Sequence, residues 1–266
     1  MITLRGRDEL VKLEEASRVV LETLEAVQKA VVPGVTTEEL DRIAEREIRG
    51  RGARPAFVGY RGYPKTLCTS VNDEVVHGIP GKRVLAEGDI VGIDCGAVLE
   101  GYYGDAARTL PVGRISAEKA LLLEVTRQAL EAGIGAARAG NRVSDIGAAV
   151  EGVAITHGYG VVRDFVGHGV GTALHEEPQI PNYGPPGRGI LLKAGMVIAI
   201  EPMFNLGRAD VTVDRDGWTV RTRDGSGSAH FEYTVAIEPR GAVILGMGRL
   251  ADTAAGRDPA SAAVGA

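Results

Sequence analysis

Acidic residues stand inside or beside strongly apolar segments at four places in this 266-residue chain. Asp94 lies within an apolar run, Glu201 ends another, and Asp105 and Glu232 lie in segments with strand-like alternation. Short apolar runs of this kind, bounded by turn residues, predict β-strands. A buried carboxylate without a partner is costly and needs a cation or hydrogen-bond donors. Any fold for this chain must therefore supply partners for acids within a sheet.

Residues 89–109 predict a β-hairpin. Apolar residues lead into the turn Leu99-Glu100-Gly101, and the return begins at Tyr102-Tyr103. Because Glu100 is nearly equidistant from Asp94 and Asp105 in sequence, we expect these two side chains to lie almost opposite one another. Directly opposed carboxylates repel unless a positive charge lies between them.

A histidine accompanies these acids. His168 lies in Gly167-His168-Gly169, where the glycines allow close backbone approach. Any one of the five residues alone is more typical of a satisfied core group, but together they favour a metal site. Two divalent cations would neutralise four carboxylates. Oxygen ligands with one imidazole and no thiolate suit Mn, Fe(II), Co or Zn.

Helical periodicity adds an α layer to the strands. Apolar spacing predicts a helix over residues 8–32, and Thr36 with Glu39 forms a capping box for a second helix that ends near Gly50. Further helices are predicted over residues 116–137 and 143–157, and strands over 197–245. The fold class is therefore α+β, with a possible pseudo-twofold repeat of two αβ halves. We expect one catalytic domain over residues 1–250 and a flexible tail over 251–266, which has little to bury.

Composition narrows the class of protein. The net charge of −5 gives no indication of nucleic-acid binding. The two cysteines, Cys68 and Cys95, are not closely spaced, which favours a reducing compartment over a disulfide framework. The N-terminus lacks the apolar segment of a secretory signal, and no run approaches the roughly 20 apolar residues of a membrane span. These features predict a cytoplasmic protein without a membrane partner.

Two short motifs partly match known binding patterns, but neither match is complete in its context. Residues 246–251 match the dinucleotide pattern G-x-G-x-x-A but leave no room for the helix and strand that would hold a cofactor. His175-Glu176 begins like the zinc motif H-E-x-x-H, but Gln179 stands where the second histidine belongs. Neither motif therefore predicts a site.

The chain resembles the methionine aminopeptidases, which are metallopeptidases of the pita-bread fold. The short interval from His168 to Glu201 resembles the type I bacterial form, without a long N-terminal extension. The resemblance covers roughly residues 4–245. It is carried by Gly59-Tyr60-Arg61-Gly62-Tyr63-Pro64-Lys65, Val71-Asn72-Asp73-Glu74-Val75-Val76-His77-Gly78-Ile79-Pro80, Gly88-Asp89-Ile90-Val91-Gly92-Ile93-Asp94, Gly104-Asp105-Ala106-Ala107-Arg108-Thr109, Gly167-His168-Gly169-Val170-Gly171, His175-Glu176-Glu177-Pro178, Ile200-Glu201-Pro202 and Asp216-Gly217-Trp218-Thr219.

This resemblance implies an activity and a ligand set. The expected reaction removes the initiator methionine from nascent chains whose second residue is small, by attack of a metal-activated hydroxide on the first peptide bond. It also implies nascent N-termini as partners, transient ribosome contact and a monomer. The implied ligands of two divalent metal ions are Asp94, Asp105, His168, Glu201 and Glu232, with Asp105 and Glu232 bridging.

Three further roles are implied near the metals. Glu201 would shuttle a proton, His175 would stabilise the developing oxyanion, and His77 would contact the scissile amide. The methionine side chain would bind among aromatic and thiol groups, which suit a polarizable thioether. This pocket would consist of Tyr60, Tyr63, Cys68 and Trp218, although Tyr60 alone is equally typical of a packed loop residue.

Three positions depart from the commonest family pattern, and one histidine does not enter the site. Phe57 stands where a small residue or Cys is frequent, Leu174 where Phe or Met is usual, and His230 where Gln is common. None of these departures removes an implied ligand, but they predict a changed pocket shape and pH profile. His157, just before Gly158, is interpreted as a helix cap or surface residue.

Two alternative functions remain. Xaa-Pro aminopeptidases and prolidases use the same five ligand types, but they usually carry a large extra N-terminal domain, which disfavours them here. A pita-bread binding protein without catalysis is the second alternative. Intact ligands argue against it, because binding alone does not require four clustered acids.

Overall fold

The computed structural model describes residues 2–248 and 250. Within them, four helices confirm the predicted segments to within two residues at each end. The Thr36 capping box is present, with the Thr36 hydroxyl and the Glu39 carboxylate each accepting the other residue's backbone N–H. The helices are α1 (Arg7–Ala30), α2 (Thr37–Gly50), α3 (Ala117–Ala136) and α4 (Val143–His157), and a short 3-10 turn η1 spans Tyr60–Gly62. The tail predicted for 251–266 lies outside the described residues.

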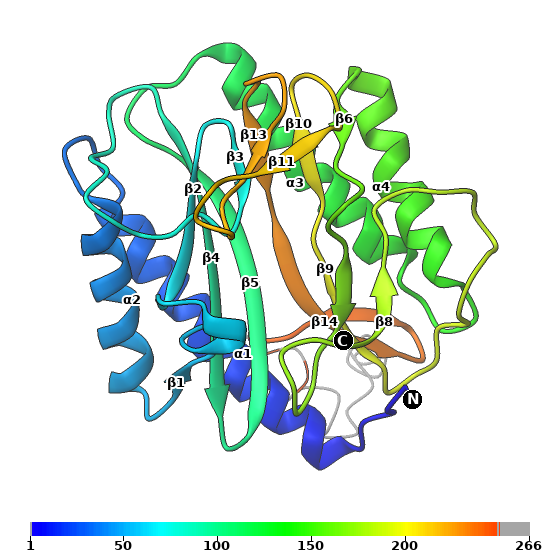
Figure 1. Cartoon of the computed structure of the whole chain (residues 1–266). Coiled ribbons are helices and arrows are strands. Elements are labelled where there is room, and N and C mark those ends of the chain that lie inside the picture. Colours follow the sequence, from blue (N-terminus) through cyan, green and yellow to red (C-terminus); the bar gives the residue numbers. More distant parts are fainter. Residues whose placement is uncertain (1, 249, 251–266) are drawn as a thin grey trace, which may run out of the picture.

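A curved antiparallel sheet forms the centre of the molecule (Figure 1). Its order is β1-β4-β5-β14-β9-β7-β8, with β2 added beside β4 and β15 beside β14. The strands are β1 (Arg54–Pro55), β2 (Leu67–Val71), β4 (Ile90–Leu99), β5 (Tyr102–Pro111), β7 (Gly167–Gly169), β8 (Glu176–Ile180), β9 (Val197–Ile200), β14 (Glu232–Glu238) and β15 (Gly241–Ile244).

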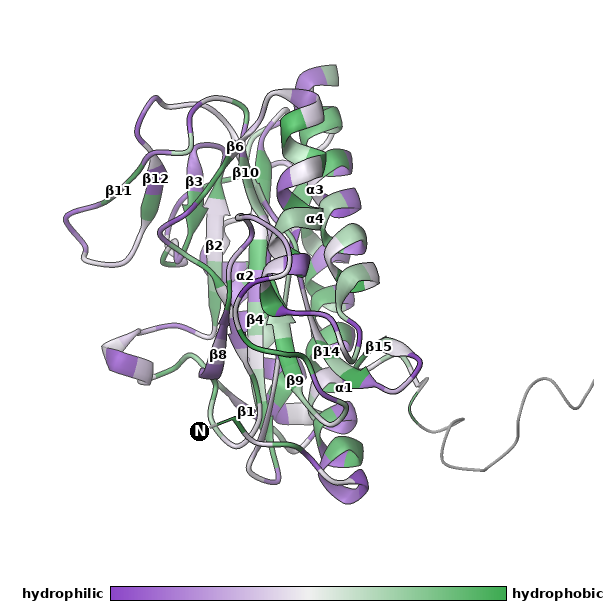
Figure 2. Cartoon of the chain, turned by 90° about the vertical axis from the view of Figure 1, so that its right-hand side faces the viewer, coloured by the Kyte–Doolittle hydropathy of each residue, from purple (hydrophilic) through white to green (hydrophobic). Residues whose placement is uncertain are grey.

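Two three-stranded sheets complete the fold. One has the order β13-β10-β6 and the other the order β11-β12-β3. Figure 2 shows the helices against one side of the central sheet, with β3, β11 and β12 on the other side. Their strands are β3 (Glu74–Val76), β6 (Gly160–Val161), β10 (Met203–Asn205), β11 (Val211–Val213), β12 (Val220–Thr222) and β13 (Ser228–His230).

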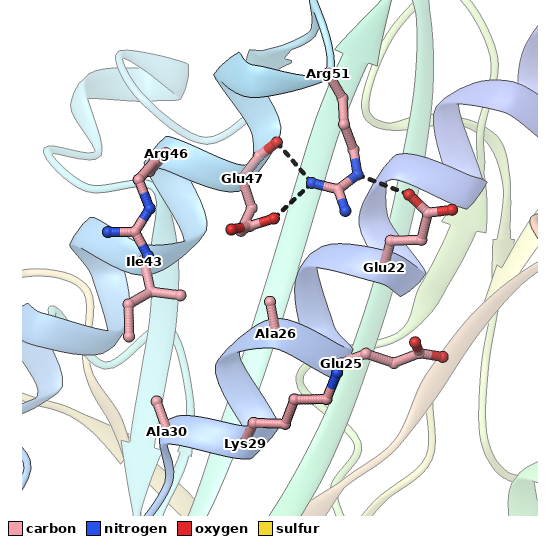
Figure 3. Close-up of a pocket in the computed structure, with 9 residues that line it drawn as sticks. All are labelled: Glu22, Glu25, Ala26, Lys29, Ala30, Ile43, Arg46, Glu47 and Arg51. Atoms are coloured by element: carbon pink, nitrogen blue, oxygen red, sulfur yellow. Dashed lines mark hydrogen bonds and ion pairs between the residues drawn. The ribbon is translucent and has the colours of Figure 1, made fainter.

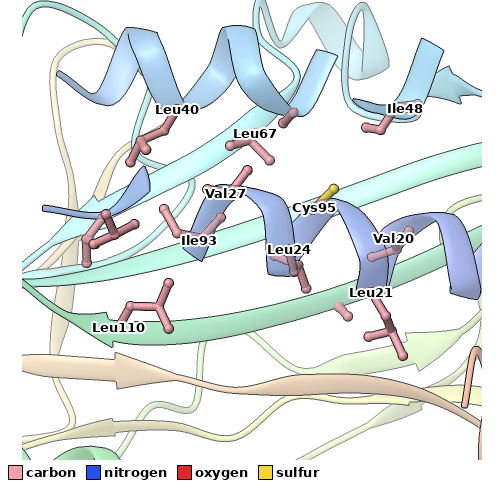
Figure 4. Close-up of a cluster of buried hydrophobic side chains, with 14 of the residues drawn as sticks. Val20, Leu21, Leu24, Val27, Leu40, Ile48, Leu67, Ile93, Cys95 and Leu110 are labelled. Carbon is pink, nitrogen blue, oxygen red and sulfur yellow. The ribbon is translucent and has the colours of Figure 1, made fainter. Parts of the chain in front are cut away.

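Alternation along β4 separates the core from the opposite face. Ile93 and Cys95 point to the helices and pack into a fully buried cluster with Leu24 and Val27 of α1 (Figure 4). Asp94, between them, therefore points to the face without helices, because successive strand residues alternate. A second cluster packs α3 and α4 against β9 and β14. The helices thus leave one face of the sheet to the acids.

Two details of the sequence prediction are wrong. Asp94 pairs with Ala107 and Asp105 with Gly96, so the two acids are diagonal neighbours on one face rather than opposite one another. The turn holds two residues with positive φ, Glu100 (φ 50°) and Gly101 (φ 84°), which sets the register. Glu201 also lies just after β9 and not within a strand.

The failed dinucleotide motif has a structural explanation. The backbone N–H groups of Gly246 and Gly248 donate to the two carboxylate oxygens of Glu14, at 2.8 and 2.6 Å. Glu14 is buried within α1, and Gly246 packs so closely on Ser17 that a Cβ would lie 2.7 Å from its carbonyl carbon. These glycines therefore anchor the segment that follows β15 to α1.

Two expectations drawn from composition are consistent with the structure. Cys68 and Cys95 are both free and buried. Among the helices of residues 2–248 and 250, none combines the length and the hydropathy needed to cross a membrane.

Candidate active site

Five neighbouring strands bring the predicted metal ligands together. In the order β4-β5-β14-β9-β7, each strand or its end contributes one residue to the helix-free face of the sheet. Glu232 pairs with Ala107, and Ala107 pairs with Asp94, so these three residues lie side by side across β14, β5 and β4. In strand order the five residues are Asp94, Asp105, Glu232, Glu201 and His168.

The donor atoms of this group are close enough to share a cation. One ligand atom from each of Asp105, His168 and Glu232 lies within 4.8 Å of the other two. His168 Nε2 lies 3.5 Å from Glu201 Oε1 and 3.9 Å from Asp105 Oδ2. Asp94 adds a fourth carboxylate diagonally from Asp105. The arrangement gathers acceptors from distant parts of the chain around one point.

Several acceptors in this group have no partner among the described residues. Asp94 Oδ1, Asp105 Oδ1 and Glu232 Oε1 are inaccessible to solvent and receive no hydrogen bond. Asp105 is 5% exposed and Glu232 is 2% exposed. Native proteins rarely leave buried acceptors unpaired, so these oxygens fit a cation that the protein binds.

The same burial changes the acidity of the group. Burial raises the pKa of Asp94 to about 7. Burial and the neighbouring carboxylates raise the pKa of Asp105, Glu201 and Glu232 well above their ordinary values. In the absence of cations the site therefore holds protons, which bound cations would displace.

His168 is held in the tautomer that a metal ligand requires. Its Nδ1 lies 2.9 Å from the carbonyl oxygen of Gly169, which can only accept a hydrogen bond. Burial lowers the pKa of His168 to about 3, so the ring is neutral. The Nε2 lone pair therefore points to the acids, and a backbone carbonyl of this kind is the usual orienting partner of a ligating histidine.

His230 is a site residue that sequence reasoning did not place. Its ring is 4% exposed, and Nε2 lies 3.9 Å from both Glu201 Oε2 and Glu232 Oε2, without a hydrogen-bond partner among the described residues. The only sequence feature that pointed to His230 was the histidine itself, at a position where Gln is common in the family. Its proximity to the acids depends on the pairing of His230 with Met203, which no local pattern predicts.

The acids line a cavity of about 580 Å³, and part of its remaining wall is aromatic. Tyr63 makes edge contacts with Trp218 and Phe57, at ring-centroid distances of 5.0 and 6.5 Å. The thiol of Cys68 lies beside Asp94, its partner in the β2–β4 register. All four predicted pocket residues line the cavity, and so do two of the departures: Tyr60, Tyr63, Cys68, Trp218, Phe57 and Leu174.

His77 and His175 line the same cavity as the acids. His77 follows β3 with a positive φ of 63° and contacts Phe165 and Trp218 edge-on. Burial lowers the pKa of His77 to about 4. His175 contacts the ring of His168, with centroids 4.2 Å apart, and partial burial together with the Arg61 charge lowers its pKa. Both rings are therefore neutral N–H donors near neutral pH.

A larger hollow of about 740 Å³ lies between α1 and α2, away from these acids (Figure 3). Its lining has three acids and three basic residues, and the Arg51 guanidinium contacts Glu22 and Glu47, each at 2.6 Å. Glu25, Lys29, Arg46 and aliphatic residues complete the lining. Because its charges neutralise one another at the surface, this groove has none of the features of a cation site.

Comparison with known proteins identifies the class to which this site belongs. A model of metallopeptidase family M24 matches residues 11–239. This match covers most of the chain, including all five clustered residues. The chain therefore belongs to metallopeptidase family M24.

Individual relatives narrow the assignment. The chain is 51% identical to the methionine aminopeptidase of Clostridium acetobutylicum, over 92% of this chain and 98% of that protein. Its structure matches the methionine aminopeptidase of Rickettsia prowazekii with a TM-score of 0.92 at 41% identity, over 93% and 100% of the two chains. Within family M24, the chain thus belongs to the methionine aminopeptidases, and the predicted pita-bread α+β fold is confirmed.

The prolidases are more distant. The prolidase from Pyrococcus furiosus matches with a TM-score of 0.75 and 25% identity, and this chain covers only 65% of it. The two proteins share the fold.

Proposed function

We propose that this chain is a two-metal aminopeptidase that removes the N-terminal methionine from proteins whose second residue is small. One observation carries the proposal: four carboxylates and an imidazole meet on one face of five adjacent strands, beside a cavity with an aromatic and thiol wall. Membership of the methionine aminopeptidases supports the same reaction.

Two divalent ions, of Co, Mn, Fe(II) or Zn, would be held by Asp94, Asp105, His168, Glu201 and Glu232. When bound, such ions neutralise the carboxylates, polarise the carbonyl of the first peptide bond and lower the pKa of a water molecule. The unpaired oxygens of Asp105 and Glu232 are suited to hold these ions, because each buried oxygen needs a positive partner.

The chain's own groups then handle protons and orientation. Glu201, whose side chain is 13% exposed, lies between the imidazoles of His168 and His230 and takes a proton from the attacking water. The same carboxyl group returns the proton to the departing amine. His77 donates to the amide at the scissile bond, and His175 donates to the oxygen on which negative charge develops.

The aromatic wall selects the side chain. Tyr63 and Trp218 meet edge-on, and their faces together with the Cys68 thiol offer polarizable contacts to a thioether. Tyr60 and the departures Phe57 and Leu174 complete this wall. The pocket therefore favours methionine over short or charged side chains. Nascent N-termini are the proposed partners, and transient ribosome contact and a monomeric state stay predictions.

Peptide specificity tests this function. Protein loaded with Mn or Co should release methionine from Met-Ala-Ser and leave Ala-Pro peptides intact. Cleavage of Ala-Pro in preference to Met-Ala-Ser would indicate a proline-directed enzyme. Tight binding of metal without hydrolysis of either peptide would favour the binding-protein alternative.

A further inference from the structure

Two neighbouring imidazoles of the cavity face different partners through the same ring nitrogen. His168 Nδ1 lies 2.9 Å from the carbonyl oxygen of Gly169, whereas His175 Nδ1 lies 2.7 Å from the hydroxyl oxygen of Tyr60. A carbonyl only accepts, while a phenol hydroxyl also donates. The two rings, 4.2 Å apart, can therefore carry their hydrogens on different nitrogens.

The chemistry of the two groups favours one direction for the hydrogen bond between Tyr60 and His175. Within the described part of the chain, the Tyr60 hydroxyl has no partner other than His175 Nδ1. Its ring also lies beside the His175 ring, with centroids 5.1 Å apart. A phenol that donates its hydrogen to Nδ1 leaves the single hydrogen of a neutral imidazole on Nε2. This direction is favoured even though the contact is exposed to water, because a phenol O–H is a stronger donor than an imidazole N–H and an imidazole nitrogen is a stronger acceptor than a phenol oxygen.

The backbone around Tyr60 holds this hydroxyl in place. Tyr60 N donates to Phe57 O, and Tyr63 N donates to Tyr60 O, each at 2.9 Å. Gly59, with φ 82°, provides the left-handed conformation that starts this tight turn. Tyr60 and His175 are 115 residues apart in sequence, so their contact also joins two walls of the cavity.

We propose that Tyr60 is a positioning residue whose hydroxyl donates to His175 Nδ1 and keeps the His175 hydrogen on Nε2. His168 and His175 then differ in role because their Nδ1 partners differ. Nε2 of His168 presents a lone pair to the acids, and Nε2 of His175 presents an N–H to the cavity. The catalytic consequence rests on the proposed function: an N–H at His175 can stabilise an oxyanion, whereas a lone pair there would repel it.

Nitrogen NMR of the histidine rings tests the proposal directly. In ¹⁵N-labelled, Zn-loaded wild-type protein, with His175 signals assigned by their loss in His175→Asn, Nδ1 of His175 should be unprotonated and Nε2 protonated. The His168 ring should show the reverse pattern at Nδ1. Tyr60→Phe keeps the ring but removes the hydroxyl, and should shift the His175 signals towards a mixture of the two tautomers.

Kinetics and a matched variant sharpen this test. Tyr60→Phe should lower kcat for Met-Ala-Ser about 3- to 10-fold and change KM less, because one oriented hydrogen bond is lost. Tyr63→Phe removes a hydroxyl that faces the Leu67 and Gly78 carbonyl oxygens instead, and should leave the His175 nitrogen signals unchanged.

Two NMR results would overturn the proposal: a hydrogen on Nδ1 of His175 in the wild type, or unchanged His175 signals in Tyr60→Phe. The wild-type tautomer decides the matter even if Tyr60→Phe folds poorly. Failure of wild-type protein to cleave Met-Ala-Ser would contradict the proposed function alone, since the NMR result does not depend on activity.

Discussion

Acids line both the hollow between α1 and α2 and the cavity on the central sheet, and the two regions differ in how those acids are neutralised. Between α1 and α2, Glu22 and Glu47 share the guanidinium of Arg51, and the Glu22 and Arg51 side chains are 45% and 32% exposed (Figure 3). In the sheet cavity, Asp105 and Glu232 are almost completely buried, and each has a carboxylate oxygen without a partner among the described residues.

This difference separates structural charge from functional charge. Exposed ion pairs contribute little to stability, because water and salt screen them. Buried acids without partners destabilise the metal-free fold and are retained only where a bound cation repays the cost. The hollow between α1 and α2 therefore gives no indication of function, although it is larger. The buried acids of the sheet cavity define the functional site.

The largest expected effect comes from one carboxylate-to-amide change made in each region. Asp105→Asn should lower kcat/KM for Met-Ala-Ser at least about 100-fold, because it removes a carboxylate of the proposed metal site, whereas orienting residues alone contribute about 10–100-fold. Glu22→Gln is the matched control and should leave kcat/KM unchanged. Equal losses in the two variants would remove the distinction between the regions.

Acidity gives the next largest effect. Because the folded pKa of Asp94 is raised from 3.8 to about 7, metal-free protein should lose stability as the pH rises from about 4 to about 7, with no further loss from this group above that pH. Cations compete with these protons, so lowering the pH from 8 to 6 should weaken Mn binding about tenfold or more. Calorimetry in buffers of different ionisation enthalpy should detect proton release at pH 6. Binding without proton release would contradict the assigned acidity.

The aromatic wall predicts a smaller change. Trp218→Ala should raise KM for Met-Ala-Ser about 3- to 10-fold, because it removes an aromatic contact from the pocket. Metal content should not change, since Trp218 lies outside the acid cluster. Cys68→Ser keeps the volume and should have a milder effect. Unchanged kinetics in Trp218→Ala would mean that this residue has only a structural role.

The smallest effect is expected for a change in the hollow between α1 and α2. Arg51→Gln breaks two exposed ion pairs and should cost no more than about 1 kcal/mol of unfolding free energy. Salt should reduce the difference between wild type and variant. Urea denaturation at low and high salt measures it, and a cost of several kcal/mol would show that the groove charges are more important than their exposure implies.

Local pattern was sufficient for much of the fold. The four helices follow from apolar spacing and caps, and the hairpin over residues 89–109 follows from its apolar runs and turn residues. The hairpin register was missed because it depends on the conformation of the turn, where Glu100 and Gly101 both adopt positive φ. A one-residue error in the turn centre moves a pairing by two residues.

The site was only partly predictable, for a related reason. The predicted ligands are brought together by pairing between β5, β14 and β9, which lie far apart in sequence. Resemblance supplied that grouping, and the structure then placed all five residues on one face. His230 and the Tyr60–His175 contact could not be predicted, because each depends on tertiary contacts between distant segments.

The central claim is that the buried acids hold the cations on which peptide hydrolysis depends. Chelator-treated protein should be assayed with Met-Ala-Ser while its metal content is measured in the same samples, before and after stepwise addition of Mn. We predict no methionine release without metal, and recovery that follows binding of up to two ions per chain. Full activity in the metal-free samples would contradict this account.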